Sequence, residues 1–335
     1  MSDQQYVIIG SEYSPFSVKV RSYFRYKKIP HEWRPRTLET QAEFQKYAKL
    51  PLIPLILGPD ETVWQDSTPI IETFEEKFPD PALQPPSAVL GYLSCLIEDY
   101  GDEWVNKPMF HYRWWRPEDQ EAVSRGLARA VNPKGDREAQ DQLADTIRTR
   151  MVPRLRFVGS SEKTKDVIEA SFDSLLSLLA KHLEARKYLF GGRPSLGDFG
   201  LFAQIYCCLQ QPTTAKILKQ GYPEITDWID RMLNPKAEQG WEDWSTLAPT
   251  LEPLIRKQIG DIYLPWSLAN EQAILGGEDE FSLDLMDQEF SQKSVKYAAK
   301  SIHVLRSRLA DTADREELDK ILDHCGCLQP LLSQS

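Results

Sequence analysis

The segment Leu50-Pro51-Leu52-Ile53-Pro54-Leu55, followed by Gln65-Asp66-Ser67-Thr68, indicates how the first part of the chain folds. A proline at the start of a strand is unusual because it removes a donor from the hydrogen-bond ladder. A cis Ile53-Pro54 bond would turn the backbone N–H and C=O of Ile53 outward, where they can pair with an extended ligand. The alternative is an ordinary trans proline at a sheet edge.

The residues around these segments alternate between strand-like and helix-like patterns. Short apolar runs predict strands, and apolar residues at helical spacing predict helices. In chain order the predicted elements are strand Tyr6–Ile9, helix Phe16–Lys27, strand His31–Arg34, helix Leu38–Lys49, strand Pro54–Leu57, strand Thr62–Gln65 and helix Ser67–Phe78. This β-α-β-α-β-β-α order is typical of a small α/β domain.

The chain changes character after residue 78. Residues 79–87 hold four prolines and predict a linker. Residues 88–235 have helical periodicity and no strand pattern, and Phe199–Gln210 is apolar nearly all round, which predicts a buried central helix. The last part of the chain offers a strand candidate at Phe281–Leu285, an amphipathic helix at Val295–Leu309 and a charged tail after Asp311 that we expect to fray.

Composition excludes several classes of protein. The 335 residues include 41% hydrophobic and 27% charged side chains, and the net charge of −10 gives no general attraction for nucleic acid or an anionic membrane. No apolar run approaches the roughly 20 residues that cross a bilayer. The polar start Met1–Gln5 lacks the pattern of a secretory leader. Five cysteines are too few, and odd in number, for a disulfide scaffold, so we expect a reduced, cytoplasmic protein.

Nothing in the sequence predicts a metal site. Cys207 and Cys208 fall in the predicted buried helix, where they are expected to be core residues. Cys325-Gly326-Cys327 is too tightly spaced for zinc, with only His324 nearby, and we expect a surface thiol pair in a mobile tail.

Tyr13-Ser14-Pro15-Phe16-Ser17 lies between the first predicted strand and the first predicted helix. A serine before a proline is good helix-capping chemistry, since the hydroxyl can accept from exposed amides and the proline costs no hydrogen bond at the first position. Asp66 and Ser67 stand at the start of another helix, where amides and the helix dipole favour an anion. A ligand carboxylate at Ser67 with an ammonium at Asp66 is one interpretation, and simple capping is the other.

In their order and spacing these segments resemble the thioredoxin-like, glutathione-binding domain of the cytosolic glutathione S-transferase superfamily. Ser195-Leu196-Gly197-Asp198 before the apolar helix resembles the capping box of the family's helical domain. The resemblance covers about residues 5–235 and implies an α/β domain at residues 1–80 and an all-helical domain at residues 88–239. We expect residues 240–335 to be a C-terminal extension packed on the helical domain. The family also implies a homodimer.

The resemblance implies roles for matched residues. Ser14 stands where serine- and cysteine-type members keep their active hydroxyl or thiol, and Pro54 matches the cis-proline beside the cysteinyl part of glutathione, with which Ile53 would pair. Asp66 and Ser67 match the pair that holds the γ-glutamyl end. Many relatives carry a lysine two residues before the cis-proline to bind the glycyl carboxylate, whereas this chain has Leu52. Lys49, Arg34 and Arg36 are the candidates to replace it.

The implied function is that of a transferase with glutathione as co-substrate. The glutathione thiol titrates well above neutrality, and a hydroxyl donor at a helix start favours its nucleophilic thiolate. Ser14 can donate such a hydrogen bond, and Tyr13 is the alternative donor. A serine cannot form a mixed disulfide, so it disfavours a disulfide reductase. A lyase or an isomerase could use the same site, and a non-catalytic binding or scaffold protein could share the fold.

The second substrate is expected to be a small hydrophobic electrophile bound between the domains. Flat apolar molecules stack on aromatic side chains. Candidates for these contacts are Phe16, Tyr100, Trp104, His111, Tyr112 and Trp115. The alternative is that the aromatic stretch from residue 100 to residue 115 packs into the interdomain core, with His111 as a core or surface histidine rather than a general base.

Overall fold

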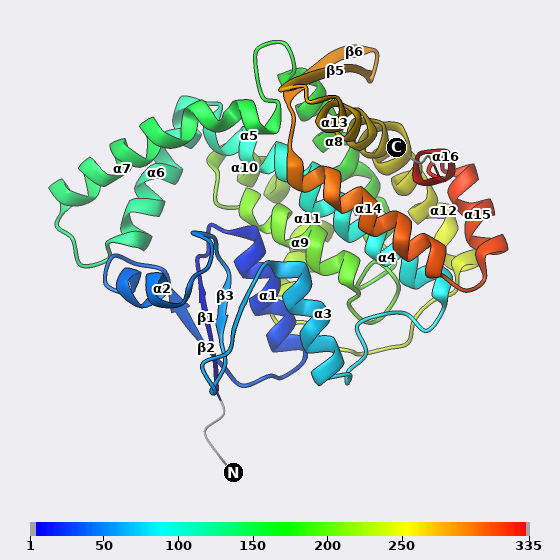
Figure 1. The fold of residues 1–335 in the computed structure, drawn as a ribbon, viewed down its shortest axis with the longest axis horizontal. Coiled ribbons are helices and arrows are strands. Elements are labelled where there is room, and N and C mark those ends of the chain that lie inside the picture. The colour runs from blue at the N-terminus through cyan, green and yellow to red at the C-terminus, as the bar shows by residue number, and fades with distance from the viewer. Residues whose placement is uncertain (1–4, 333–335) are drawn as a thin grey trace.

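The computed structural model describes residues 5–332 and combines a small sheet with a large helical assembly (Figure 1). Residues 1–4 of the polar start and residues 333–335 of the expected extension lie outside the described residues. The chain thus has a thioredoxin-like α/β part followed by a helical part and an extra C-terminal segment, as the sequence predicts.

The first part contains the predicted order of elements. These are β1 (Tyr6–Gly10), α1 (Pro15–Tyr26), β2 (His31–Pro35), α2 (Gln41–Tyr47), β3 (Leu55–Leu57), β4 (Val63–Gln65) and α3 (Ser67–Lys77). The sheet order is β2-β1-β3-β4, with β1 and β2 parallel and the other pairs antiparallel. The Ile53-Pro54 bond is cis. Helix α2 is shorter than predicted because Thr37 and Thr40 accept from each other's backbone N–H in a turn.

Alternating side chains along the strands give each face of the sheet its own core. Ile8 and Ile56 are fully buried in the large cluster that includes residues of α1 and α3. Ile9 and Leu55 point to the other face and pack with Phe44 of α2. The sheet is therefore covered by helices on both faces, which fixes where the chain leaves β1 and enters α3.

The helical part begins after the proline-rich segment and contains the predicted buried central helix. Its elements are α4 (Ala88–Tyr100), the π-helical turn η1 (Gly101–Val105), α5 (Asn106–Trp114), α6 (Pro117–Val131), α7 (Arg137–Met151), the 3-10 turn η2 (Val152–Val158), α8 (Lys165–Leu183), α9 (Leu196–Cys208), α10 (Pro212–Gly221) and α11 (Pro223–Leu233). Ser195 and Asp198 form the predicted capping box of α9. None of the helices between residues 5 and 332 is long and apolar enough to cross a membrane.

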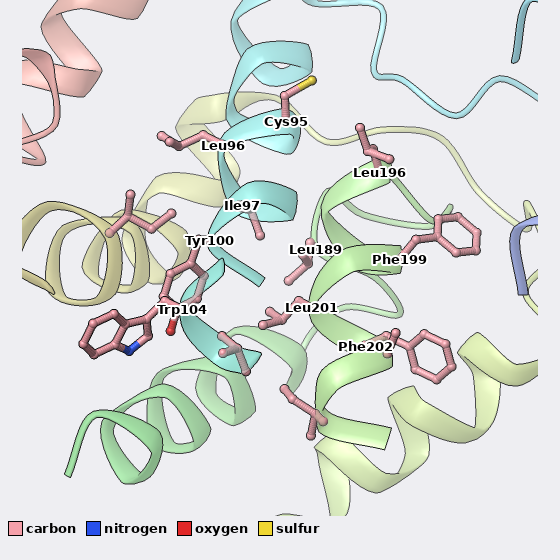
Figure 2. Close-up of a cluster of buried hydrophobic side chains, with 14 of the residues drawn as sticks. Cys95, Leu96, Ile97, Tyr100, Trp104, Leu189, Leu196, Phe199, Leu201 and Phe202 are labelled. Carbon is pink, nitrogen blue, oxygen red and sulfur yellow. The ribbon is translucent and has the colours of Figure 1, made fainter. Parts of the chain in front are cut away.

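Helices α4 and α9 cross closely at the centre of this part (Figure 2). A Cβ atom built on Gly101 would lie 2.9 Å from the backbone of Gly200 and Leu201, so only glycine fits at that crossing. Phe199 and Phe202 extend from α9 on one side of the cluster, while Tyr100 and Trp104 extend from the α4–η1 helix on the other. This close contact fixes the position of the start of η1 relative to α9.

The C-terminal segment is folded throughout its described length. It contains α12 (Trp244–Leu254), the π-helical η3 (Ile255–Tyr263), α13 (Leu264–Gly276), the hairpin β5 (Glu280–Leu285) and β6 (Gln288–Lys293), α14 (Lys296–Asp311), α15 (Arg315–His324) and α16 (Leu328–Leu332). Helix α14 contacts α4 and runs diagonally across it in Figure 1, while α12 and η3 contact α8. The extension therefore packs on the helical part.

Two expectations for the tail are wrong. The residues after Asp311 do not fray but form α15 and α16, because Leu318, Ile321 and Leu322 make an apolar face that is buried. Cys325 and Cys327 are fully buried rather than a surface pair. The charged residues that suggested a loose tail occupy the solvent side of the same helix.

Candidate functional site

A cavity of about 390 Å³ is lined by residues from both parts of the chain and from the extension. The first part contributes Phe16, Leu50, Leu52, Ile53, Pro54, Gln65, Asp66 and Ser67; the helical part contributes Asp102, Glu103, Asn106, Lys107, Phe157 and Val158; and the extension contributes Trp266, Gln292, Val295 and Tyr297. A ligand there would contact all three segments at once.

The wall from the first part is built around two backbone features. Asp66 has a φ of 77°, which is uncommon for a residue with a side chain, and it directly precedes α3. Ser67 is 3% exposed at the first position of that helix, where free amides and the helix dipole favour an anion. The Gln65 side chain accepts from the N–H of Leu50 at 3.1 Å and donates to the carbonyl of Leu52 at 2.9 Å. This amide holds the loop that leads to Ile53 against the start of α3.

The rim of the cavity carries exposed apolar side chains. Leu50 is 55% exposed, Leu52 60%, Phe157 42% and Tyr297 55%. Large apolar side chains gathered around one opening are unusual on a soluble surface and mark a site for an apolar ligand or partner. The opening of the cavity is thus largely apolar.

The opposite wall is pinned by one glutamine of β6. Gln292 is buried, and its Oε1 accepts from Lys107 Nζ at 2.6 Å and from Trp266 Nε1 at 3.1 Å. Its Nε2 donates to the carbonyl oxygen of Phe157 at 2.8 Å. The extension therefore fixes the helical wall of the cavity through a single amide whose donor and acceptor sides are both used.

Behind the cavity a buried lysine joins three helices. Lys19 of α1 is fully buried, and its ammonium pairs with Glu98 of α4, with Asp102 of η1 at 2.6 Å and with the hydroxyl of Thr68 in α3 at 3.1 Å. Burial acts to lower the pKa of Lys19, but the charges of Asp102 and Glu98 outweigh it and raise that pKa. Burial likewise raises the pKa of Asp102, against the attraction of Lys19. The cation therefore holds together carboxylates that would otherwise repel one another.

The extension reaches the first wall directly. The Tyr297 hydroxyl donates to Oδ2 of Asp66 at 2.9 Å. Burial, and then the charge of Asp66, raise the pKa of that phenol, so it stays a donor at neutral pH. One oxygen of the Asp66 carboxylate is thus already hydrogen-bonded within the chain.

The structure brings five of the sequence-predicted site residues together. Phe16, Ile53, Pro54, Asp66 and Ser67 all line the cavity. Ser14 precedes Phe16 by two residues and caps α1, accepting from the N–H of Ser17 at 3.3 Å.

Tyr13 is not among the residues that line the cavity. It packs in the cluster around Trp114, and its hydroxyl lies where a Cβ on Gly126 of α6 would be. Burial raises the pKa of Tyr13.

The other aromatic candidates lie in the core rather than around the cavity. Tyr100 donates to Gln258, and Trp104 donates to Ser171. Each of the two is 1% exposed, and Tyr112 is 2% exposed. These three side chains are therefore buried in the core, which was the stated alternative to a role in substrate binding.

His111 is fully buried between Ser160 at 2.7 Å and Glu169 at 3.0 Å. Burial lowers the pKa of His111. Trp115 is partly buried and stacks on His111 with ring centroids 5.3 Å apart. The pair lies with the other aromatics outside the cavity lining.

The two arginine candidates for a glycyl carboxylate are engaged elsewhere. Arg34 pairs with Glu32 and Glu43, while Arg36 stacks on Phe44 at 3.9 Å. Neither these arginines nor Lys49 line the cavity, whereas Lys107 does.

Thirteen of the eighteen lining residues were not predicted as site residues, among them Lys107, Trp266, Gln292 and Tyr297. In the sequence, Lys107 lies between the aromatic candidates Trp104 and His111. A charged residue within an otherwise aromatic stretch could have been singled out as a candidate site residue. Trp266, Gln292 and Tyr297 come from a segment whose position in space the sequence does not show.

Between residues 5 and 332, no group of three or more His, Cys, Asp or Glu side chains is arranged to hold a metal ion. Of the acidic side chains that line the cavity, Asp102 pairs with Lys19, and Asp66 accepts from Tyr297.

Two family models match this architecture. Residues 8–82 match the model of the glutathione S-transferase N-terminal domain, and residues 136–231 match that of the glutathione S-transferase C-terminal domain. Together they account for just over half of the chain. The chain belongs to the glutathione S-transferase superfamily. No curated protein matches it in sequence.

Several solved structures are similar to this chain at low sequence identity. Glutathione transferase GSTFuA3 from Phanerochaete chrysosporium is 16% identical, with a TM-score of 0.49 over 70% of this chain and 98% of that one. The beta-etherase LigF from Sphingobium sp. strain SYK-6 is 16% identical, with a TM-score of 0.48 over 68% of this chain and 94% of that one. A bacterial zeta-class maleyl pyruvate isomerase is 22% identical, with a TM-score of 0.40 over 67% and 90%.

Replacing Lys19 with methionine is expected to destabilise this superfamily member strongly. The change leaves Glu98 and Asp102 without their shared cation, and breaking a buried pair on one side costs about 3–5 kcal/mol. The measurement is the urea midpoint of unfolding. Lys46→Met, which removes an exposed pair with Glu61, is the control and should leave the midpoint unchanged. Equal midpoints for both variants would contradict the role assigned to Lys19.

Proposed function

We propose that this protein is a glutathione transferase that joins the glutathione sulfur to a hydrophobic electrophile. One observation carries the proposal: a single cavity has Ile53, Asp66 and Ser67 on one wall and an apolar surface, including Trp266 and Val295, on the other. A peptide-like ligand and an apolar molecule can meet there without crossing the protein. Membership of the superfamily supports glutathione as the peptide.

In the proposed complex, the first wall binds glutathione. Its γ-glutamyl carboxylate accepts from the Ser67 hydroxyl and from amides at the start of α3, and its ammonium pairs with Asp66. The backbone of Ile53, beside the cis Pro54, pairs with the cysteinyl residue. Asp66 keeps one oxygen for the ammonium while the other accepts from Tyr297.

Ser14 is the proposed donor to the thiolate. Its oxygen accepts from the Ser17 amide, so its own hydrogen is free to donate toward a sulfur near Phe16. Tyr13, the alternative donor, packs instead beneath α6 against Gly126. These contacts support Ser14 over Tyr13.

The apolar rim and the second wall are the proposed site of the electrophile. Phe157 and Leu52 are exposed at the opening, and Trp266 is buried deeper. The core aromatics Tyr100, Trp104 and Tyr112 have no part in this proposal beyond packing. The homodimer and the cytoplasmic location stay predictions from the sequence.

The double variant Asp66→Asn, Ser67→Ala is expected to lose glutathione affinity. Each substitution removes a hydrogen bond to a charged group, so the dissociation constant should rise by about 10-fold to 100-fold for each. Isothermal titration calorimetry with glutathione is the measurement. The matched control is Ser282→Ala, Asp284→Asn on exposed positions of β5. Unchanged affinity in the site variant would refute the assigned binding mode.

Ser14→Ala is expected to raise the pKa of bound glutathione, because the thiolate loses a hydrogen-bond donor. The ultraviolet absorbance of the thiolate, followed against pH in the binary complex, reports this directly. Tyr13→Phe is the matched control and should leave the titration in place. If only Tyr13→Phe shifts it, the phenol is the donor.

One contact favours a non-catalytic protein. The Tyr297 hydroxyl already donates to the Asp66 carboxylate, which would hold the ammonium of glutathione. In a non-catalytic protein, this side chain could occupy the place of the ligand. The transferase proposal expects wild-type protein to bind glutathione, and expects Tyr297→Phe to change the affinity by less than about tenfold. A scaffold protein with a closed pocket would fail to bind until Tyr297 is changed. Calorimetry on both proteins separates the two functions.

A further inference from the structure

Lys107 is a buried lysine in the far wall of the cavity, at the first turn of α5. It is 2% exposed, and its Nζ lies 3.8 Å from the centre of the Trp266 ring and 5.4 Å from that of Trp104. It lines the same cavity as Phe16 and Ser67. A cation on aromatic faces is stabilised there without a carboxylate.

The hydrogen bonds of Lys107 are incomplete. An ammonium has three donors, and the described residues take one of them, through Gln292 Oε1 at 2.6 Å. No carboxylate between residues 5 and 332 lies within ion-pair distance of Lys107. Since Gln292 is itself fixed by Trp266 and Phe157, the amine is held in place with donors left for a ligand in the cavity.

Burial lowers the pKa of Lys107 to about 7, against the opposing charge of Glu103. Burial also raises the pKa of Glu103. Lys107 therefore exchanges a proton near neutral pH, which is where a general acid is most effective. The other charged or titratable residues that line the cavity are Asp66, Asp102, Glu103 and Tyr297. The elements around Lys107 carry further such groups, which include His111 and Arg113 of α5, Arg154 and Arg156 of η2, Lys165 and Glu169 of α8, Glu271 of α13, and Glu289 and Lys293 of β6.

We infer that Lys107 is a catalytic residue that protonates the carbonyl oxygen of an α,β-unsaturated carbonyl substrate as the glutathione sulfur adds to it. The inference rests on the proposed transferase function and assigns a proton donor to the same cavity. The assigned role needs a fixed donor in an apolar pocket opposite the glutathione wall, which is the place that Lys107 occupies.

The step balances without a further reactant. The thiolate sulfur forms a bond to the β-carbon, the C=C electron pair moves toward the carbonyl, and the resulting enolate oxygen takes a proton from the Lys107 ammonium. The enol then returns to the carbonyl form. The neutral amine regains a proton from solvent, equal to the one that the glutathione thiol released on ionisation.

This chemistry separates two kinds of electrophile. An enal develops negative charge on oxygen and needs a proton. A benzylic halide expels chloride, which needs none. A proton donor that lines the cavity therefore lowers the barrier for the enal much more than for the halide.

The test compares trans-2-octenal with 4-nitrobenzyl chloride, each with glutathione, for wild type, Lys107→Met, Lys107→Arg and the exposed-site control Lys134→Met. We expect Lys107→Met to lower kcat/KM for the enal by about 100-fold or more. Activity of the same variant on the chloride, whose leaving group needs no proton, should fall much less than its activity on the enal. Lys134→Met should match wild type on both substrates.

The pH profile gives a readout that a structural role would not produce. For wild type with the enal, kcat/KM should fall as the pH rises through about 7, because the ammonium that donates the proton is lost. That descending limb should be absent with the chloride, and in Lys107→Arg it should move beyond the range because a guanidinium does not titrate there.

Equal loss on both substrates in Lys107→Met, or the same descending limb with both, would overturn the role of Lys107 while leaving the transferase function in place. Wild-type protein inactive on both substrates despite binding glutathione would overturn the proposed function and this inference together. If Lys107→Met fails to fold, the pH profiles of wild type and Lys107→Arg with the enal test the role of Lys107 without it.

Discussion

The buried Lys19 ammonium is the constraint on which the site depends. Its partners Thr68, Glu98 and Asp102 belong to three different helices, α3, α4 and η1, and Lys19 itself belongs to a fourth, α1. A charge cannot be buried without compensation, so these helices are obliged to meet at one point. Since α3 begins at the wall that carries Asp66 and Ser67, and η1 leads into the wall that holds Lys107, the ionic junction sets the two walls opposite each other.

The extension completes the cavity rather than merely covering a surface. Gln292 of β6 fixes Lys107, Trp266 and the carbonyl of Phe157, and Tyr297 of α14 reaches Asp66 on the other wall. Neither wall is therefore complete without residues beyond position 240. The extension thus contributes Trp266, Gln292, Val295 and Tyr297 to the cavity, beside Lys107 of α5.

Short sequence patterns predicted Ile53, Pro54, Asp66 and Ser67 in the cavity wall that the first part of the chain forms. The order of elements follows from residues next to one another in the chain, and Asp66 and Ser67 fall at the start of α3, as predicted. The local pattern left the Ile53-Pro54 bond open between cis and trans, and the family resemblance implied the cis form that the structure has. The aromatic stretch was harder, because helical periodicity says which residues share a face but not which face meets the cavity. Gln292 and Tyr297 could not be found, since their partners are far away in the chain.

The central claim is that a tripeptide lies between the two walls with its sulfur facing the electrophile. A crystal structure of the protein with glutathione tests it most directly. We expect the γ-glutamyl end at Asp66 and Ser67, the cysteinyl backbone against Ile53, and the sulfur between Ser14 and the wall that carries Lys107. Crystals grown at saturating glutathione in which Tyr297 still holds Asp66 and no tripeptide is seen would contradict it.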